Sequence, residues 1–576
     1  MTDQKNLILT IVISIAILFG FHYFYERPRQ MAAQAEAQRQ QAMQADLTPP
    51  AAAPGTAPGI GGDAVPAVRD RTTVLAETGR VVISTPSLHG SINLRGGRVD
   101  DLTLAKYKTT PDKNSPEVVL LAPVGSEHPY YADFGWVAAT AGDSVALPKA
   151  DTVWTASGNN LTPDSPVTLT WNNGAGLVFE RTFAIDANYM FTVTQRVRNE
   201  TGTSVALSPY GFVQRRGMPK VEGTYVLHEG PLAIVDGTLK EYKYADLKED
   251  GKTIDLSSNG GWIGITDKYW LVGLIPDQTT KTDMRVLHQM AGATDIYQVD
   301  YKAPAVTIAA GQVSETTHRL FAGAKVVGLL NDYTEKLGID SLDYAVDWGW
   351  FYFLTKPFFH GLDWLGVTIG NFGIAILVFT VFLRLAFFPI ANKQYEAFAK
   401  MKKLQPKMEE LKKKHGDNRE ALSMEMMKLY KEEKANPLAG CLPILLQIPV
   451  FFALYKVLYV TIEMRHAPFY GWIHDLSAPD PTTLFNLFGL IPWDPPSFLH
   501  IGIWPLLMGI TMWLQMKMNP SNPDPIQQKV FMLMPFIFTF MMAAFPAGLV
   551  IYWTWSNLLS IAQQWYIMRR MGVKAT

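Results

Sequence analysis

The hydrophobic positions divide the chain into three parts that differ in their period. A continuous apolar run occupies residues 7–25, short runs that alternate with polar residues fill residues 74–335, and long apolar runs return after residue 341. A helix rises about 1.5 Å per residue, so about 20 apolar residues cross the hydrocarbon core of a bilayer. Period-two alternation is instead typical of half-buried strands. The pattern therefore predicts a polytopic α-helical membrane protein with a large β domain outside the membrane.

The first apolar run, Leu7–Tyr25, predicts a membrane anchor that is not cleaved. No small-x-small cleavage site follows it, and its aromatic end, His22–Tyr25, suits a membrane interface. Residues 1–6 form a short segment before this anchor. Residues 26–73 are rich in Gln, Ala and Pro and have little to bury, so we expect a flexible linker.

The strand-like region, residues 74–335, predicts one large all-β sandwich. Val167–Trp171 and Leu177–Phe183 flank the turn-forming run Asn172–Gly176, which indicates a β-hairpin. The histidines of this region are scattered without metal-ligand spacing, and no nucleophile–base pair is evident in the sequence. We therefore expect a protein that is not an enzyme and holds no metal or cofactor. A membrane-tethered carbohydrate enzyme is an alternative, and it predicts activity from this domain alone.

An aromatic-rich segment, residues 341–368, precedes the next long apolar run. Trp348, Trp350 and Trp364 are interspersed there with charged residues such as Lys356. This composition favours an amphipathic helix that lies in the membrane interface on the outer side. The alternative is a short helix packed under the sandwich.

Five further spans are expected after this segment. The apolar run Val530–Met568 has 39 residues, which is roughly 58 Å of helix and about twice a bilayer core. The sequence Phe545-Pro-Ala-Gly breaks this run into a hairpin of two spans. The predicted spans are residues 372–390, 437–460, 501–518, 530–545 and 547–568.

Charge orients these spans. The loop of residues 391–435 carries twelve Lys/Arg and eight Asp/Glu, whereas residues 461–500 carry one Arg and no Lys. Under the positive-inside rule the first loop is cytoplasmic, as are residues 519–529 and the tail 569–576. Six spans with both chain ends inside satisfy every loop. With 51 basic and 52 acidic residues the whole chain is nearly neutral, which argues against a general nucleic-acid binder.

The basic loop is predicted to be a cytoplasmic helical hairpin. Its apolar side chains recur at helical spacing: Phe398, Met401, Leu404, Met408 and Leu411. Pro406 is expected to kink the first helix, and Lys412–Lys414 stand where cations are favoured, at its C-terminus. Asp417 and Glu420 fit a capping box that opens the second helix. The many methionines suit either a surface that accepts varied apolar partners or simple core filling.

One charge, Arg384, lies inside the span of residues 372–390. A guanidinium at that depth costs at least about 2.5–3.5 kcal/mol. Either Arg384 extends to the cytoplasmic headgroups, or it faces a wet cavity inside the helix bundle. Thr380, one helical turn earlier on the same face, favours the cavity. A cation there without a carboxylate partner would attract anionic segments entering from the cytoplasm.

The remaining polar groups of the spans favour neither transport nor hydrolysis. They are Gln447, Lys456, Gln515, Thr539, Trp553 and Asn557. A proton-driven transporter would be expected to bury Asp or Glu carriers, and an ATP-driven pump would need a Walker motif. A small-molecule transporter remains an alternative, and it predicts repeat symmetry between the two halves.

Motifs in the last 236 residues carry a family resemblance. In chain order they are Val381–Pro389, Lys400–Met408, Glu425–Lys431, Asn436–Tyr455, Ala467–Pro468, Trp472–Ser477, Gln527–Lys529 and Phe545–Asn557, with weaker matches at Gly90–Gly97 and Gly260–Ile263. Together these motifs resemble the YidC-type membrane protein insertases, a family that includes mitochondrial and chloroplast members.

The resemblance implies a groove lined by five spans, open to cytoplasm and lipid, that holds one arginine. The groove residues implied in this chain are Arg384, Thr380, Gln447, Gln515, Tyr552 and Trp553, with Trp553 standing where a tyrosine is often found. The implied capture residues of the hairpin are Lys402, Lys403, Met408, Lys412, Lys413 and Lys414. The outer domain resembles a sugar-mutarotase fold without a catalytic site, and residues 482–499 look like an insertion.

The function implied by this resemblance is to insert and fold nascent proteins in the bacterial inner membrane, alone or with the Sec translocon. The implied partners are nascent membrane proteins, the Sec translocon with its accessory subunits, the ribosome and anionic lipids. No specific nucleic acid is implied.

Overall fold

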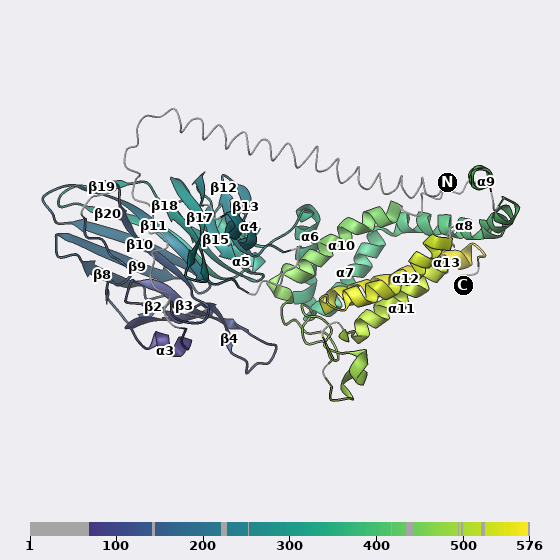
Figure 1. Ribbon diagram of the computed structural model, residues 1–576, viewed down its shortest axis with the longest axis horizontal. Coiled ribbons are helices and arrows are strands. Elements are labelled where there is room, and N and C mark those ends of the chain that lie inside the picture. Colours follow the sequence, from purple (N-terminus) through teal and green to yellow (C-terminus); the bar gives the residue numbers. More distant parts are fainter. Residues whose placement is uncertain are drawn as a thin grey trace, which may run out of the picture. The chain divides into compact units, whose positions relative to one another are not determined.

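The computed structural model describes residues 68–140, 145–219, 227–250, 253–415, 418–433, 442–493, 495–496, 499–519 and 525–573. The predicted anchor, Leu7–Tyr25, and almost all of the predicted linker lie outside the described residues. The described chain forms two compact units, a β unit of residues 68–372 and 452–478 and a helical unit of residues 373–451 and 479–573. Figure 1 shows the elements of both units.

Two large sheets form the β unit. The first has the strand order β14 (Ile254–Asn259), β17 (Lys281–Ala291), β18 (Thr294–Lys302), β11 (Val205–Arg216), β5 (Tyr130–Ala138), β3 (Arg98–Lys108), β2 (Leu88–Asn93), β1 (Arg80–Ser84) and β7 (Asn160–Leu161), with β19 (Val306–Ile308) beside β11 and β4 (Glu117–Leu121) beside β3. The second has the order β13 (Thr238–Glu241), β12 (Gly230–Val235), β15 (Trp262–Thr266), β16 (Trp270–Ile275), β20 (Val313–Ala324), β10 (Met190–Asn199), β9 (Leu177–Ile185), β8 (Val167–Asn172) and β6 (Thr155–Ala156).

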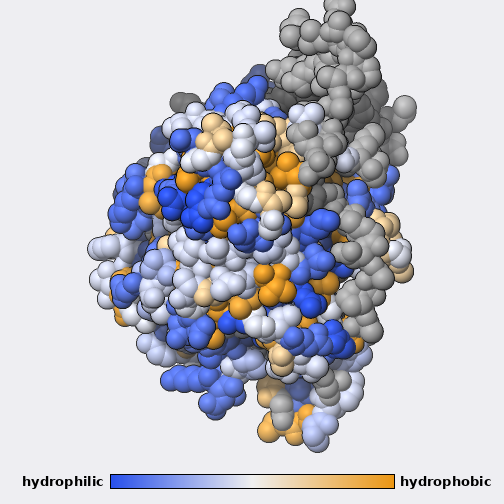
Figure 2. All heavy atoms as spheres, turned by 90° about the vertical axis from the view of Figure 1, so that its left-hand side faces the viewer, coloured by the Kyte–Doolittle hydropathy of each residue, from blue (hydrophilic) through white to orange (hydrophobic). Residues whose placement is uncertain are grey.

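The β-rich domain expected from period-two alternation is therefore confirmed. Strand β9 buries every second residue along most of its length, and β8 pairs with it through the predicted hairpin, with Trp171 opposite Phe179. Large side chains such as Trp262, Phe134 and Tyr301 fill the interior. The face of this unit in Figure 2 is mostly hydrophilic, and hydrophobic residues occur there only in small groups.

Short helices complete the β unit, so it is not purely β. They are α3 (Arg71–Leu75), α4 (Tyr244–Asp250), α5 (Val327–Leu337), η2 (Leu342–Ala345), α6 (Tyr352–Ile369) and η4 (Ile462–Met464). The predicted amphipathic helix of residues 341–368 begins later than expected, because residues 342–345 form a separate 3₁₀ turn. Helix α6 does have two faces: Thr355, Phe359 and Leu362 are buried, whereas Phe353 and Trp364 are exposed.

The helical unit contains the remaining helices. They are α7 (Phe372–Ala386), α8 (Phe388–His415), α9 (Arg419–Glu432), α10 (Leu442–Val460), η5 (Leu484–Gly489), α11 (Ile503–Met518), α12 (Pro525–Met542) and α13 (Ala547–Arg570). Helix α11 packs against α12 and α13, and α8 packs against α13 and α9 (Figure 1). The C-terminal half of α10 belongs to the β unit, so this helix is shared between the two units.

The predicted span of residues 372–390 is not one continuous helix, because α7 ends at Ala386 and α8 begins at Phe388. The two axes are bent by 70°. Pro389 explains the break, since proline has no N–H for a helical hydrogen bond and its ring clashes with the preceding turn. Within the described residues no single helix is long and apolar enough to cross a membrane, and the bent pair α7–α8 is the one combination with sufficient length and composition. The six spans stay a prediction.

The predicted helical hairpin is formed by α8 and α9, with one difference from expectation. Pro406 lies inside α8, and the kink expected there stays a prediction. The N-cap of α9 is Asn418, whose side chain accepts a hydrogen bond from the backbone N–H of Ala421. The predicted capping box that opens on Asp417 is therefore wrong by one residue. Asparagine is as good an N-cap as aspartate, so sequence alone did not separate them.

A buried carboxylate in the β unit provides a pH-dependent stability term. The Glu463 carboxylate accepts a hydrogen bond from the first backbone N–H of α5, at Val327 (3.3 Å), and its second oxygen is buried with no hydrogen-bond partner among the described residues. Burial raises the pKa of Glu463 from 4.5 to about 7. The folded protein therefore holds a proton on Glu463 at pH values where the unfolded chain has already lost it.

We expect the free energy of unfolding to fall as pH rises from about 4.5 to about 7, by up to roughly 3 kcal/mol from this group. Above pH 7 the contribution is constant. Thermal unfolding of the detergent-solubilised protein across this range, compared with Glu463→Gln, measures the effect. The Gln variant keeps a neutral side chain, so its profile should be flatter. If the stability of the two proteins changed with pH in parallel, the pH dependence could not be assigned to Glu463.

Candidate functional site

A cavity of about 180 Å³, lined by both polar and apolar residues, lies in the helical unit. Its walls come from five helices, α7, α8, α10, α11 and α13, and from two connections next to them. The lining residues are Arg384, Phe387, Ile390, Ala391, Gln394, Tyr395, Phe398, Gln447, Val450, Gln515, Asn519 and Ser560. Arg384 is the one charged side chain in this lining. A space of this size holds several water molecules or a few side-chain atoms.

The bend between α7 and α8 is what builds this cavity. Arg384 stands in the last turn of α7, and Phe387 lies at the break. Helix α8 then leaves at an angle and is held by its own contacts with α13, where Ala391 and Tyr395 cluster with Ile567. A straight helix would continue past the arginine, whereas the bent one lets α8 supply five of the lining residues.

Within the described part of the chain, the Arg384 guanidinium donates its hydrogen bonds to Ser556. Its Nη2 donates to the backbone carbonyl of Ser556 at 3.2 Å and to the Ser556 hydroxyl. Arg384 is partly exposed and, among the residues that the structure describes, forms no ion pair with a carboxylate. Both acceptors are neutral, so no carboxylate of the described residues compensates the positive charge at the cavity. An uncompensated charge in a partly dehydrated site interacts strongly with an incoming anion.

Helix α13 supplies a row of polar groups opposite the arginine. Tyr552, Ser556 and Ser560 recur every four residues and therefore share one face of the helix. The Tyr552 hydroxyl accepts a hydrogen bond from Gln447 Nε2 at 3.0 Å, which ties α13 to α10. The Ser560 hydroxyl donates to the Ser556 carbonyl at 2.8 Å. Of these three residues Ser560 lines the cavity, while Ser556 accepts the hydrogen bonds from Arg384.

The structure separates the six predicted groove residues into two groups. Arg384, Gln447 and Gln515 line the cavity, and Tyr552 lies directly behind Gln447. Thr380 and Trp553 lie outside the lining. Thr380 is buried, and its hydroxyl donates to the Ile376 carbonyl of its own helix at 2.6 Å.

Trp553 is part of an aromatic contact between three helices. Its ring lies 4.9 Å from that of Phe451 and 5.5 Å from that of Phe538, measured between centroids. The indole therefore packs α10, α12 and α13 together. We assign it to the support of the cavity rather than to its surface.

Several lining residues were missed by reasoning from the sequence. Gln394, Tyr395 and Asn519 lie outside the apolar runs, so a search for polar groups within spans does not reach them. Ser560 can be predicted from the sequence, because Tyr552, Ser556 and Ser560 follow one another at a spacing of four residues. The bend at Phe387 is what brings α8 into the site, and it had not been predicted.

Lys456, expected among the polar groups of the spans, belongs to a different environment. Its Nζ is 2.7 Å from Asp347 Oδ2 within the β unit, and both side chains are largely buried. Lys456 is therefore a paired cation, in contrast to Arg384.

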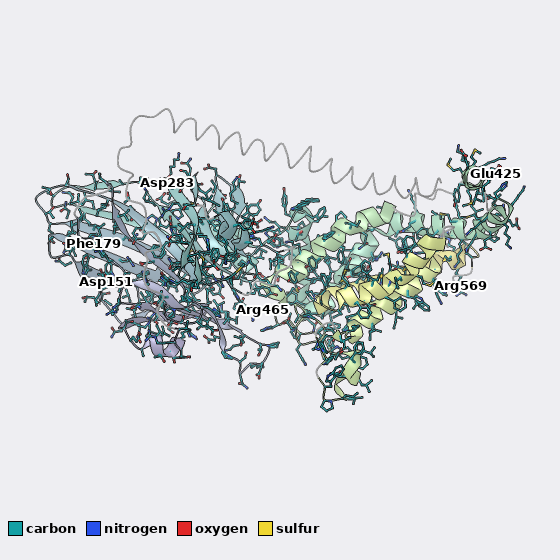
Figure 3. The ribbon with its side chains drawn as sticks, in the orientation of Figure 1. Asp151, Phe179, Asp283, Glu425, Arg465 and Arg569 are labelled. Carbon is teal, nitrogen blue, oxygen red and sulfur yellow. The ribbon has the colours of Figure 1, made fainter. Side chains whose placement is uncertain are left out.

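The hairpin places its predicted capture residues on different surfaces. Lys403, Lys412, Lys413 and Lys414 are exposed, whereas partial burial lowers the pKa of Lys402. Met408 is buried and packs with Leu404 in the core between α8 and α9. The exposed methionines are instead found on α9, at Met424 and Met427. Figure 3 labels Glu425 on this helix and Arg569 at the C-terminal end of α13.

Within the described residues no group of three or more His, Cys, Asp or Glu side chains could hold a metal ion. The cavity lining offers hydrogen-bonding side chains and one positive charge. It can bind a polar or anionic segment in a recess between helices.

Comparison with known proteins assigns both parts of the chain. A family model described as the YidC periplasmic domain matches residues 80–361, and one described as a 60Kd inner membrane protein matches residues 364–574. The membrane protein insertase YidC of Methylobacterium radiotolerans is 50% identical over 99% of this chain and 96% of its own length.

Two solved structures show weaker likeness. A crystal structure described as an active YidC insertase with its first transmembrane domain resolved has a TM-score of 0.37 at 17% identity, over 88% of this chain and 95% of that one. A galactose mutarotase related enzyme from Lactobacillus acidophilus has a TM-score of 0.30 at 9% identity, over 42% of this chain and 97% of that one. Neither TM-score supports a conclusion about this chain.

Proposed function

The chain belongs to the YidC family of membrane protein insertases, and from this premise we propose that it inserts nascent membrane proteins by drawing their anionic polar segments into the cavity at Arg384. The observation that carries the proposal is the partly exposed guanidinium on the cavity wall, whose neighbours there are neutral. A substrate carboxylate is the group that such a site lacks. Charge attraction in a recess between helices is stronger than in bulk water.

The physical benefit of the recess is a shorter polar path across the membrane. Moving a charged or hydrogen-bonding tail through hydrocarbon is costly, because no partner replaces its water. In our proposal the tail binds among Arg384, Gln447 and Gln515, while the apolar segment of the substrate moves laterally into the lipid. Burial of that segment then drives the reaction without a nucleotide.

We place this cavity in a six-span arrangement with both chain ends in the cytoplasm. The basic hairpin α8–α9 would then face the cytoplasm, where its exposed lysines can meet anionic lipids or a ribosome carrying a nascent chain. The β unit would lie outside the membrane. Cooperation with the Sec translocon and its accessory subunits is part of the same proposal.

Reconstitution tests the central claim. Purified protein in liposomes is given a single-span substrate with a short acidic tail, and protection of the tail from added protease measures insertion. We expect insertion several-fold above protein-free liposomes, because the site lowers the barrier for the tail. Neutralising the acidic residues of the tail should reduce the difference in insertion between liposomes with and without the protein.

The matched control uses liposomes that contain the protein and a substrate whose tail is already neutral. Equal insertion with and without protein, for acidic-tailed substrates, would contradict the proposed function. Enhanced insertion that ignores tail charge would keep the insertase function and remove the role of charge.

A further inference from the structure

A second cavity, of about 240 Å³, lies in the β unit, remote in sequence from the first. Neighbouring strands β3, β5, β11 and β18 of the first sheet form one wall, and β9 of the second sheet contributes Arg181. The side chains that carry the argument below are those of Arg98, Tyr131, Asp133, Arg181, Gln214 and Arg216, all of which line the cavity.

The floor of this cavity is a relay of hydrogen bonds across three strands. Tyr131 and Gln298 are the cross-strand neighbours of Gln214 on either side. The Tyr131 hydroxyl donates to Gln214 Oε1 at 2.6 Å, and Gln214 Nε2 donates to Gln298 Oε1 at 3.0 Å. Gln298 Nε2 donates in turn to Asp300 at 2.9 Å. Because both ends are anchored, the amide of Gln214 has a fixed orientation with its oxygen as the acceptor.

Two of the three arginines share a single carboxylate. Arg98 Nε donates to Asp133 Oδ2 at 3.0 Å, and Arg181 Nη1 donates to Asp133 Oδ1 at 3.3 Å. Arg181 also donates to the carbonyls of Gly97 and Phe134, so it is a structural link between the two sheets. Asp133 is therefore already occupied by two cations.

Arg216 is the lining arginine that forms no ion pair with any described residue. Its side chain is 8% exposed, and its Nε donates to the neutral oxygen of Gln214 at 3.2 Å. Its Nη1 is buried and has no hydrogen-bond partner among the residues that the structure describes. With Lys149 at the rim, the lining carries four cations and one carboxylate. A buried cation without an anion is unfavourable, and such a group is normally paired.

We infer that this cavity is a binding site for a small organic carboxylate, whose carboxylate group pairs with Arg216. Arg216 has an unpartnered Nη1 among the described residues, and the fork of guanidinium donors matches the planar geometry of a carboxylate. The aromatic rings of Tyr131, Phe134 and Phe212 form the apolar part of the wall, which suits a ligand with a flat face. The volume fits a molecule of about ten heavy atoms, below the usual range for drug-sized ligands. This site is independent of the insertion mechanism proposed above.

Binding of defined probes to the full-length protein in detergent tests the inference. The probes are benzoate and galacturonate, each compared with its uncharged counterpart, benzamide and galactose. Ligand-observed saturation-transfer NMR detects binding, and calorimetric titration gives the affinity. We expect at least one carboxylate to bind at least tenfold more tightly than its uncharged counterpart, and Arg216→Gln to weaken it at least tenfold.

Two variants control for structural damage. Arg196→Gln removes an exposed arginine on β10 and should leave the affinity unchanged. Arg216→Lys keeps the charge and should retain more affinity than Arg216→Gln, which a purely structural role would not predict. The inference is overturned if neither carboxylate binds below 10 mM, if the uncharged counterparts bind as well, or if Arg216→Gln binds like the unmodified protein.

Discussion

Replacing Arg384 by alanine should reduce the insertion of an acidic-tailed substrate by about ten- to a hundredfold. The change removes the charged donor that faces the cavity, and a hydrogen bond to a charged group contributes about 1.5–3 kcal/mol. Ser556 keeps its place through the helix, so the recess should survive while its attraction for anions disappears. Initial rates of tail protection in proteoliposomes provide the measurement.

The series of variants at this position separates charge from shape. Arg384→Lys keeps the charge without the fork of donors and should retain intermediate activity, whereas Arg384→Gln should resemble alanine. Arg569→Ala is a matched control, because Arg569 is an exposed arginine at the end of α13, outside the cavity lining. Unimpaired insertion by Arg384→Ala across several acidic-tailed substrates would refute charge attraction.

A coupled measurement decides whether the substrate carboxylates meet Arg384 itself. If they do, the loss of insertion caused by neutralising the tail and the loss caused by removing the arginine should not be additive. Each change then removes the same interaction. Additive losses would indicate that the tail and the arginine act separately. In that case Arg384 would serve mainly to hold α7 against α13 through Ser556.

The sequence was sufficient for the β unit and for the existence of most helices. The alternation along residues 177–185 depends on the local sequence only, because the polarity of each residue predicts which face of the strand it occupies. The arginine could also be singled out locally, since a charge in an apolar run is conspicuous wherever the chain folds.

The features that escaped prediction depend on contacts between distant segments. Pro389 indicates a break in the helix. The 70° angle between α7 and α8, however, depends on the packing of α8 on α13. Trp553 was expected in the groove because of its position in a motif, and its partners Phe451 and Phe538 come from other helices. Lys456 similarly acquires its partner, Asp347, from a segment more than 100 residues earlier.

That ion pair leads to the second large expected effect. Lys456→Met should lower the free energy of unfolding by about 3 kcal/mol, because it leaves the Asp347 carboxylate largely buried without its cation. Asp347 would keep the backbone donors of His228 and Gly349, each at 3.1 Å, so the loss should stay below that of a fully isolated charge. Thermal unfolding in detergent at a fixed scan rate, with the same protein concentration throughout, measures the shift.

The double variant Lys456→Met with Asp347→Asn identifies the cause. The free energy of unfolding of the double variant should be at least about 1 kcal/mol higher than that of Lys456→Met alone, because no unpaired ion remains. Without such recovery, the loss would have to come from the packing of the lysine stem on Gly349, where the Cε atom lies against the backbone. The comparison with Arg384 is then direct: a cation with a carboxylate partner should matter for stability, and insertion per folded molecule should be unchanged by Lys456→Met. A cation whose neighbours are neutral should instead matter for insertion, with little effect on unfolding.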